Sequence, residues 1–275
     1  MGFGRPLGRG LLIVALALYT AFAASPFVWV FVLSLRTTTE IYADPYGLPL
    51  PPHFGKFADA WLGSSYDVYF MNSVAVVFSA VAIVTVVGAM AAHCLARYQF
   101  RGNRALYFLI FSTLIFPPQV TIIALFQILI EYQLFDTRIG LILVYVSLQL
   151  PITVYILESF FRRVPSDLFD AARIDGYSEV VIFWRISLPV AWPAISTTII
   201  VNTILLWNEF LFAIVLISSD SKRTLPIGIL KFMGDQSNDV GMVATGLMIA
   251  IVPVVAIYVF FSEKLIQGMT AGAVK

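Results

Sequence analysis

The chain has 275 residues, of which 60% are hydrophobic and 12% are charged, against roughly 25% charged residues in an ordinary soluble domain. This composition, with a mean hydropathy of +0.89, excludes a typical soluble globular protein. The formal net charge of +1 predicts no nucleic-acid partner, and one cysteine with two distant histidines predicts neither a disulfide framework nor a metal site.

Six apolar runs are each long enough to cross a bilayer, which takes about 20 residues in a helix. They lie at residues 11–33, 70–95, 105–130, 139–161, 194–217 and 242–265. The runs are too long for barrel strands and do not alternate as such strands do. Arg5 and Arg9 precede the first run, but its apolar core exceeds that of a signal peptide, so we expect a true span. We predict an all-α integral membrane protein, a single transmembrane domain over residues 1–275 with six transmembrane helices.

Positive charge is divided unequally between the two sides of these spans. Eleven of the 17 lysines and arginines fall on the side that holds both termini, and six fall on the other side. Because lysine and arginine concentrate in cytoplasmic loops, we predict a multi-pass protein of the cytoplasmic (inner) membrane with both termini cytoplasmic. The outer loop 34–69 holds four prolines. It is predicted to be either an ordered extracytoplasmic cap or a simple connector.

The cytoplasmic loop 166–189 is polar and has the composition of a helical hairpin. Ser166 and Asp167 are expected to cap a first short helix, Gly176 to supply a bend, and Ser178 to start a second helix. The first helix gains an apolar face from Leu168, Ala171, Ala172 and Ile174. Its acidic residues argue against binding to an anionic membrane surface. The hairpin therefore favours docking of a partner protein.

Several polar or aromatic residues of the spans are candidates for lining a solute path: Gln119, Asn202, Trp207, Asn208 and Glu209. A charge at the centre of a bilayer costs roughly 2.5–3.5 kcal/mol on insertion, so Glu209 requires a reason to be there. Amides and carboxylates hydrogen-bond hydroxyl groups, and an indole stacks on a sugar ring, so this combination fits a sugar. The alternative is structural, with Asn208 and Glu209 joining helices or accepting backbone N–H groups freed by a helix break. Both interpretations stay open.

The residues around Gln119 predict an interrupted helix. Pro117 and Pro118 remove backbone donors and open a kink, so the Gln119 amide either lines a gate or belongs to a kink satisfied internally. Near the cytoplasmic end of another span, Glu158 is predicted to pair with Arg162, four residues further along the helix.

A resemblance to a known family rests on the loop, which reads Asp170-Ala171-Ala172-Arg173-Ile174-Asp175-Gly176 and continues to Phe183 and Leu188-Pro189. This pattern resembles the EAA motif of ABC importer permeases. It departs from the family at Asp170, where glutamate is usual and the charge is retained, and at Tyr177, where a small residue is usual. Segments that resemble permeases for carbohydrate import lie at 116–121, 207–210 and 223–228, and 268–275 is similar to the tail of a maltose-type subunit.

The resemblance implies a type I ABC importer permease fold whose cytoplasmic coupling-helix hairpin receives an ATPase subunit. The docking residues it implies are Asp170, Ala171, Ala172, Asp175, Gly176 and Phe183, with Gly272 and Lys275 in an ATPase-contacting tail. The partners it implies, besides membrane lipid, are a second non-identical permease, two ATPase subunits and an extracytoplasmic solute-binding protein. The chain is then no enzyme and moves a sugar, a di- or oligosaccharide, by alternating access.

ATP use requires a partner, because the chain has no phosphate-binding sequence of the G-x-x-x-x-G-K type. We therefore expect no cofactor on this chain and expect the partner ATPase to bind ATP and magnesium. An ion-coupled secondary transporter is the main alternative, but it would show inverted repeats and acids at the midplane of several spans, where only Glu209 qualifies. An intramembrane enzyme would need paired catalytic groups, and His93 has no such partner in the sequence. Neither alternative explains the loop 166–189.

Overall fold

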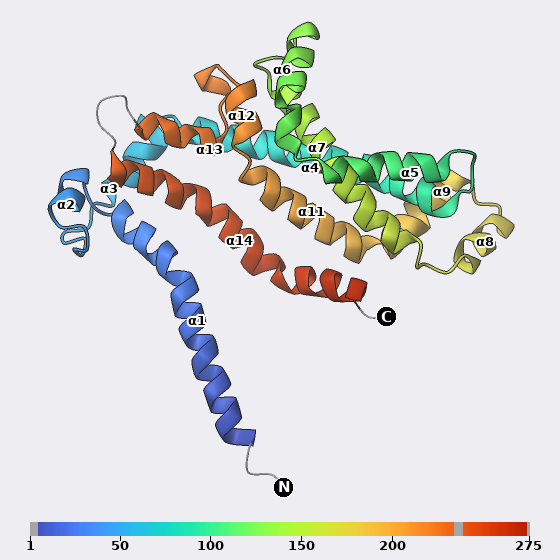
Figure 1. The fold of residues 1–275 in the computed structure, drawn as a ribbon, viewed down its shortest axis with the longest axis horizontal. Helices are drawn as coiled ribbons and strands as arrows, with labels where there is room; N and C mark the ends of the chain where they lie inside the picture. The colour runs from blue at the N-terminus through green and yellow to red at the C-terminus, as the bar shows by residue number, and fades with distance from the viewer. Residues whose placement is uncertain (1–4, 234–238, 274–275) are drawn as a thin grey trace. The chain divides into compact units, whose positions relative to one another are not determined.

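The computed structural model describes the backbone of residues 5–233 and 239–273 and the side chains of residues 8–233 and 239–261. The described chain is built from helices (Figure 1). In chain order their bounds are α1 Arg5–Ser34, α2 Thr38–Ala43, α3 Gly55–Ala58, η1 Asp59–Gly63, α4 Tyr66–Arg97, α5 Asn103–Ser112, η2 Thr113–Ile115, η3 Pro118–Thr121, α6 Ile122–Glu131, α7 Arg138–Phe161, α8 Asp167–Ile174, α9 Glu179–Ile182, η4 Phe183–Ser187, α10 Leu188–Val190, α11 Trp192–Trp207, α12 Leu211–Leu216, η5 Asp220–Lys222, α13 Leu225–Gly228, η6 Ile229–Phe232 and α14 Val240–Ala273.

Contacts within the chain define two compact units. The first comprises Met1–Asp67 and Gly228–Val252, and the second comprises Val68–Ile227 and Pro253–Lys275. The single permease domain predicted from the sequence stays a prediction. All of the features that bear on function below lie in the second unit.

Four stretches are single helices long and apolar enough to cross a membrane: Gly8–Ser34, Tyr66–Arg97, Arg138–Phe161 and Val240–Phe261. Two further pairs of helices pass the same test only together. Asn103–Ile115 and Pro118–Glu131 meet at 100°, and Glu179–Val190 and Trp192–Trp207 meet at 76°. The described residues therefore provide four spans, or six if each bent pair forms one.

The span predicted over 105–130 is bent at the two prolines, as the sequence predicts. Phe116, at the break, has extended backbone angles (φ −88°, ψ 135°), as expected for a residue whose helical conformation is blocked by the following proline. Pro118 begins the short helix η3, where its missing N–H is tolerated. The kink predicted at Pro117 and Pro118 is thereby confirmed.

The span predicted over 194–217 is also interrupted, as one of the two alternatives for Asn208 and Glu209 requires. The helix α11 ends at Trp207, and the chain resumes helical structure only at Leu211 in α12. Between these two helices, Asn208 and Phe210 have non-helical backbone angles, with φ −91° at Asn208 and φ −120° at Phe210. This break turns out to explain an acidic side chain, as described below.

The part of the outer segment 34–69 that belongs to the first unit, residues 34–67, is ordered by its own short helices and polar contacts. Thr37 caps α2 reciprocally with Glu40, whose side chain accepts the Thr37 backbone N–H at 2.9 Å. His53 Nε2 lies 3.0 Å from a carboxylate oxygen of Glu40, and Lys56 Nζ donates to the Arg36 carbonyl at 2.6 Å. These contacts favour the ordered cap over the simple connector.

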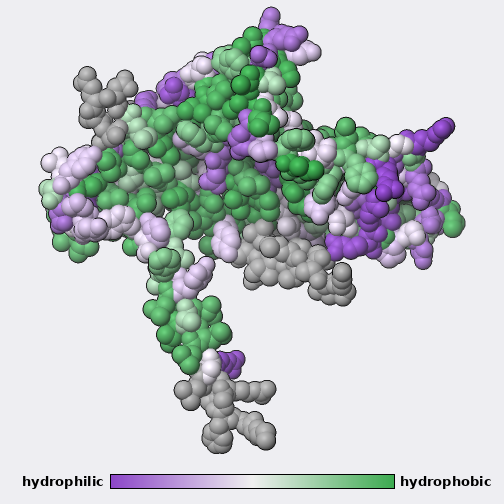
Figure 2. All heavy atoms as spheres, in the orientation of Figure 1, coloured by the Kyte–Doolittle hydropathy of each residue, from purple (hydrophilic) through white to green (hydrophobic). Residues whose placement is uncertain are grey.

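The core of the second unit lies where α4, α7 and α11 pack together (Figure 1). Small residues allow a close approach: a Cβ atom on Gly88 of α4 would meet the Thr153 side chain of α7 at 2.6 Å. The buried residues of this core are Ala89, Ala92, Leu95, Val154, Leu157, Phe161, Phe183, Ala191, Ala194 and Ile195. Figure 2 shows hydrophobic side chains over these helices and hydrophilic ones gathered at the end of the unit that carries α5, α8 and α9.

Candidate docking hairpin

The loop 166–189 folds as two short helices, α8 and α9, joined by a tight bend. Gly176 has φ +83°, a left-handed conformation that costs other residues about 1–2 kcal/mol. Its N–H bonds to the Arg173 carbonyl, and the N–H of Tyr177 bonds to the Ala172 carbonyl, both at 3.0 Å. This pair of bonds is the Schellman arrangement, which closes helix C-termini with glycine in the left-handed position. The predicted bend at Gly176 is confirmed.

The start of α8 differs in detail from the expected cap. Ser166 occupies the capping position, but its backbone is helical and its hydroxyl contacts Asp167 Oδ1 at 3.5 Å, with no cap bond to backbone N–H among the described residues. Asp167 and Asp170 in the first turn and Arg173 in the last turn complement the helix dipole. Charge placement, rather than a hydroxyl cap, therefore favours this short helix.

One face of α8 is buried against the membrane helices. Phe169, with 2% of its surface exposed, and Ala172 form an apolar cluster with Val164 and Ile182. The sequence analysis had placed Ala172 on one face with Leu168, Ala171 and Ile174. The structure separates them, because Ala172 turns inward whereas the other three are exposed. The helix thus has an inner apolar face that anchors it and an outer apolar face that is open.

An aromatic and cationic cluster joins this inner face to α4. The guanidinium carbon of Arg97 lies 4.1 Å from the Phe169 ring centroid, and Arg97 Nη2 donates to the Val164 carbonyl. The ring of His93, which is buried, lies 5.4 Å from Phe161, 6.0 Å from Phe169 and 5.4 Å from Phe183, measured between ring centroids. Helix α4 therefore ends inside the packing of the hairpin.

A chain of polar contacts reinforces the same connection. The Tyr98 hydroxyl donates to a carboxylate oxygen of Glu179. The pKa of Tyr98 is raised to about 12, mainly by burial and secondly by this hydrogen bond. Glu179 also accepts from Arg173 Nε at 2.8 Å, and Arg173 Nη1 lies 2.7 Å from Asp170 Oδ1. The bond to Glu179 raises the pKa of Arg173, so the guanidinium stays charged. Both helices of the hairpin are thereby tied to each other and to the residue after α4.

The outer side of the hairpin exposes apolar side chains. Ile174 is 86% exposed and Val180 is 67% exposed, with Leu168, Tyr177 and Trp184 also exposed. Several large apolar side chains exposed on one short element are a feature of surfaces that bind another molecule. We call these five residues the outer apolar face of the hairpin.

The docking residues predicted from the sequence divide between the two faces. Asp170, Ala171, Asp175 and Gly176 are exposed, whereas Ala172 and Phe183 are buried. Phe183 is 7% exposed and packs beside His93, so it supports the hairpin from within. Gly272 falls in the last turns of α14, but its surroundings and Lys275 lie outside the described residues. The ATPase-docking role of all these residues stays a prediction.

Two of the predicted path residues are packed between helices. Asn202 is 1% exposed, and its Nδ2 donates to Thr153 Oγ1 at 2.8 Å, which joins α11 to α7. The Trp207 side chain is buried, with its ring edge-on to Phe70 at 5.6 Å between centroids. Both side chains hold the core of the second unit in this structure.

Glu209 satisfies the backbone at the break between α11 and α12. Its carboxylate accepts the N–H groups of Phe212 at 2.8 Å and Ala213 at 3.1 Å. It also accepts the hydroxyl of Tyr145, a buried residue of α7, at 2.8 Å. The first turn of a helix leaves N–H groups without carbonyl acceptors, and a carboxylate at this position supplies the missing acceptors. These contacts favour the structural interpretation of Glu209.

Asn208 and Gln119 are the two exposed members of the set. Asn208 directly follows the last residue of α11, and its side-chain Nδ2 donates to the Ile204 carbonyl at 2.7 Å. The amide oxygen is not used in this bond. Gln119 lies in η3 after the bend. A cavity of about 470 Å³ beside this bend is lined by Thr113, Leu114, Phe116, Pro118, Val120, Thr121, Leu125, Ser147, Leu148 and Pro151. The path role of Asn208 and Gln119 stays a prediction.

The sequence alone does not predict the residues that position the hairpin and the polar side chains of α11. Arg97, Tyr98, Thr153 and Tyr145 each contact a residue at least 49 positions away in the chain. No local spacing connects such pairs, so only the packing of helices reveals them. The pair of Glu158 and Arg162, four residues apart, was predictable and is confirmed.

Comparisons with known proteins agree with this arrangement. The profile of a family described as binding-protein-dependent transport system inner membrane component matches residues 84–269. A diacetylchitobiose uptake system permease protein of Streptomyces coelicolor is 36% identical over 259 residues, which cover 94% of this chain and 86% of the relative. A trehalose transport system permease protein of Mycobacterium tuberculosis is 32% identical, covering 94% of each chain.

A third relative and a solved structure extend the comparison. An arabinooligosaccharides transport system permease protein of Halalkalibacterium halodurans is 31% identical over 277 residues, covering 98% of each chain. The solved structure is a bacterial ABC transporter involved in the import of the acidic polysaccharide alginate. One of its chains has a TM-score of 0.81 and 20% identity, covering 96% of this chain and 98% of that one. The fold of this protein is therefore similar to that of an ABC transporter chain.

Proposed function

Because the chain belongs to the family of binding-protein-dependent transport system inner membrane components, we propose that its hairpin receives an ATPase subunit and transmits ATP-driven motion to the membrane helices. The chain is a multi-pass permease subunit of an ABC importer. An ion-coupled secondary transporter is not favoured, since the family is described as binding-protein-dependent and one relative is named as a putative ABC transporter permease protein.

The observation that carries the proposal is the two-sided hairpin. Its outer apolar face, in which Ile174 and Val180 are the most exposed side chains, is open to a partner. Its inner face is fixed to α4 through Phe169, Arg97 and the contact of Tyr98 with Glu179. Packed interiors resist compression, so a displacement of the outer face moves α4 and α7 with it. Docking and transmission are thus supported by one compact element.

The remaining partners and the orientation are proposed together. We assign both termini and the hairpin to the cytoplasm, following the excess of lysine and arginine on that side. The importer then holds this chain, a second non-identical permease, two ATPase subunits and an extracytoplasmic solute-binding protein. ATP and magnesium bind to the ATPase subunits, this chain binds no cofactor, and Gly272 and Lys275 belong to a tail that contacts the ATPases.

The proposed cargo is a di- or oligosaccharide. The relatives are named for diacetylchitobiose, trehalose and arabinooligosaccharides, which share hydroxyl-rich rings. Of the polar residues in the spans, Asn208 and Gln119 are the better candidates to meet such a cargo, because their side chains are exposed. Asn202, Trp207 and Glu209 instead make contacts inside the chain, so their proposed role is to hold in place the helices that form the path.

A pull-down tests the central assignment. The tagged full-length chain is purified in mild detergent, the co-purifying proteins are identified and ATPase activity is assayed. We expect an ATPase subunit and a second permease. Recovery of the chain alone, without ATPase activity, would contradict the proposal and favour the ion-coupled transporter.

Substitution at the bend separates docking from folding. Gly176→Glu is expected to uncouple ATP hydrolysis from uptake, because it adds a charged side chain and left-handed strain at the exposed bend. A Cβ atom at this position meets nothing within 4 Å, so the fold of the second unit should survive. Gly176→Asn is the control, since asparagine tolerates the left-handed conformation and adds no charge. Unchanged coupled uptake in Gly176→Glu would refute the role of the bend.

A further inference from the structure

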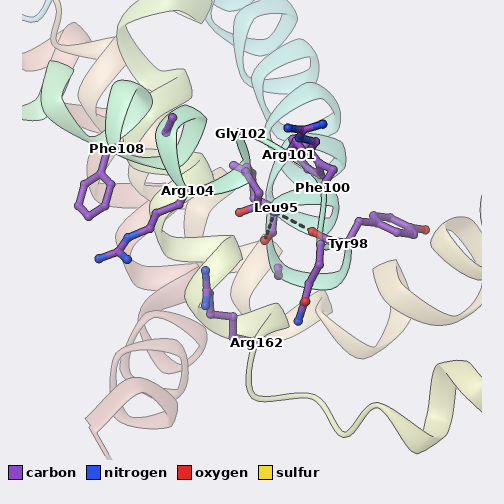
Figure 3. Close-up of a pocket in the computed structure, with 12 residues that line it drawn as sticks. Leu95, Tyr98, Phe100, Arg101, Gly102, Arg104, Phe108 and Arg162 are labelled. Carbon is purple, nitrogen blue, oxygen red and sulfur yellow. Dashed lines mark hydrogen bonds between the residues drawn. The ribbon is translucent and has the colours of Figure 1, made fainter.

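A second site lies at the same end of the second unit, beside the hairpin but separate from its outer apolar face. It is an open pocket of about 950 Å³ between the end of α4, the start of α5 and the end of α7 (Figure 3). Its lining residues are Leu95, Ala96, Tyr98, Gln99, Phe100, Arg101, Gly102, Asn103, Arg104, Ala105, Phe108 and Arg162. No acidic side chain is among the residues described as lining it.

Three arginines surround the pocket, and they come from three different places in the chain. Arg101 lies in the turn between α4 and α5, Arg104 in the first turn of α5, and Arg162 directly after α7 (Figure 3). Over residues 8–233 and 239–261, neither Arg101 nor Arg104 forms an ion pair. Arg162 is shared with Glu158. The pocket therefore holds an excess of positive charge that the described part of the chain does not neutralise.

The backbone adds to this positive character. Gly102 occupies the capping position of α5 with φ +95° and has no side chain with which to cap the helix. The Asn103 amide is turned away to the end of α4, where it donates to the carbonyls of Leu95 at 3.1 Å and Tyr98 at 2.7 Å. The N–H of Asn103 donates to the Phe100 carbonyl at 3.1 Å, whereas the next two N–H groups of α5, those of Arg104 and Ala105, have no backbone acceptor among the described residues. A helix N-terminus with such N–H groups favours an anion.

The position of the pocket determines the depth in the membrane at which it could bind an anion. Three apolar helices, α4, α5 and α7, begin or end at its edge, so it lies where membrane-spanning segments leave the hydrocarbon region. Phe108 lines the pocket, and Leu109 follows it on α5; both side chains are exposed and apolar. An occupant that carries a phosphate and acyl chains would meet both surfaces.

We propose that this pocket binds the phosphate headgroup of an anionic phospholipid, with Arg104 and Arg162 beside the phosphate, Arg101 adding positive charge at the opposite edge and Phe108 against the acyl chains. Guanidinium groups match phosphate oxygens in a bidentate geometry. Basic pockets between spanning helices on the cytoplasmic side are suited to anionic lipid headgroups. The site rests on the cytoplasmic orientation proposed above. An acidic segment of a partner protein would match the charge but not the apolar side chains that extend along α5 from the pocket.

The test compares variants of the tagged full-length chain. Lipid retained after mild-detergent purification and reloading with equal amounts of phosphatidylglycerol and phosphatidylcholine is measured by mass spectrometry. R101Q/R104Q removes two pocket charges, and R101K/R104K keeps the charge. R9Q/R163Q is the matched control, because it removes two arginines of the same expected membrane side that do not line the pocket. Inorganic phosphate is added in a separate arm as the soluble competitor.

We expect the wild type and R9Q/R163Q to retain phosphatidylglycerol in preference to phosphatidylcholine. R101Q/R104Q should lose about fivefold per arginine, roughly 25-fold in all, and R101K/R104K should lose less. Equal retention by all variants would overturn the site. Displacement of phosphatidylglycerol by inorganic phosphate would overturn the lipid assignment in favour of a soluble anion, and exclusion of lipid by a bound partner protein would overturn it in favour of an acidic segment.

The lipid result is independent of the ATPase result. Retention is measured on the tagged chain whether or not an ATPase co-purifies. A chain that keeps phosphatidylglycerol but recovers no ATPase contradicts the proposed function alone. A chain that recovers the ATPase but retains lipid equally in R101Q/R104Q contradicts the lipid site alone.

Discussion

Two regions of the second unit place polar residues in a hydrophobic chain, and they use them in opposite ways. In the hairpin, Arg173, Glu179 and Asp170 pair with one another, and the apolar side chains of Ile174 and Val180 are left outside. At the break after α11, Glu209 turns inward to backbone N–H groups. The hairpin presents a surface, whereas the break is closed within the chain.

The difference shows how a polar residue in a membrane protein should be interpreted. A carboxylate whose oxygens already accept hydrogen bonds from N–H groups of the chain's own backbone is a structural group, whatever the polarity of its side chain suggests. A polar network that leaves an apolar face uncovered indicates a partner instead. The following variants break or sharpen this contrast, in order of decreasing expected effect on stability.

The largest effect is expected from Phe169→Ala, which removes the anchor of the hairpin. Truncation of a buried phenylalanine costs about 3–5 kcal/mol, and here it also removes the ring on which Arg97 stacks. Helix α8 should exchange its amide hydrogens much faster, with ATPase binding lost. For the hydrogen exchange of α8, Leu168→Ala at the exposed neighbouring position is the control. Unaltered exchange in α8 would show that the hairpin is held by its polar contacts alone.

Glu209→Ala is expected to come next. It leaves two backbone N–H groups and the Tyr145 hydroxyl without their acceptor, at about 1–3 kcal/mol for each buried group that stays unsatisfied. Less complex should assemble, as measured by purified yield and thermal unfolding. Asn208→Ala is the control, and it should assemble normally. A Glu209→Ala protein that assembles fully but fails to import sugar would return Glu209 to the path.

Asn202→Ala tests a weaker contact inside the core. Its bond to Thr153 joins α11 and α7, and such interhelical bonds contribute about 0.6 kcal/mol on average in membrane proteins. Thermal unfolding of Asn202→Ala, Thr153→Ala and the double variant should give a coupling energy of this size. If the three changes are additive, the bond contributes nothing to the packing.

Ile174→Asp should have the smallest effect on stability, because the side chain is 86% exposed. Surface substitutions of this kind usually stay within about 0.5 kcal/mol. Uptake should nevertheless be lost, since a carboxylate would be placed at the most exposed position of the outer apolar face. Uptake assays run beside thermal unfolding distinguish these effects. Normal uptake would remove Ile174 from the docking surface.

Much of this architecture was predictable from the sequence. The all-α fold and the ABC permease family are confirmed, because hydropathy and the motif from Asp170 to Gly176 are local signals. The bend at Gly176 followed from the conformational freedom of glycine. The break in the third run followed from Pro117 and Pro118, whereas the break after Trp207 has no proline to mark it and was left as one of two alternatives for Asn208 and Glu209.

The roles of individual polar residues could not be predicted in the same way. Asn202 and Glu209 looked suited to a sugar, but their partners, Thr153 and Tyr145, lie 49 and 64 positions away. The sequence also could not divide α8 into two apolar faces. That division depends on where Phe169 packs, which only the arrangement of α4 and α7 determines.

The most direct test of the account is site-specific cross-linking from the outer apolar face in native membranes. Cys94 is exposed, so it is first replaced by serine, and single cysteines are then introduced as Ile174→Cys and, for the inner face, Ala172→Cys. The account predicts that Ile174→Cys cross-links to an ATPase subunit, with a yield that changes on ATP addition, and that Ala172→Cys does not. Cross-linking of Ile174→Cys to lipid alone, or equal labelling from both positions, would contradict the docking role of the hairpin.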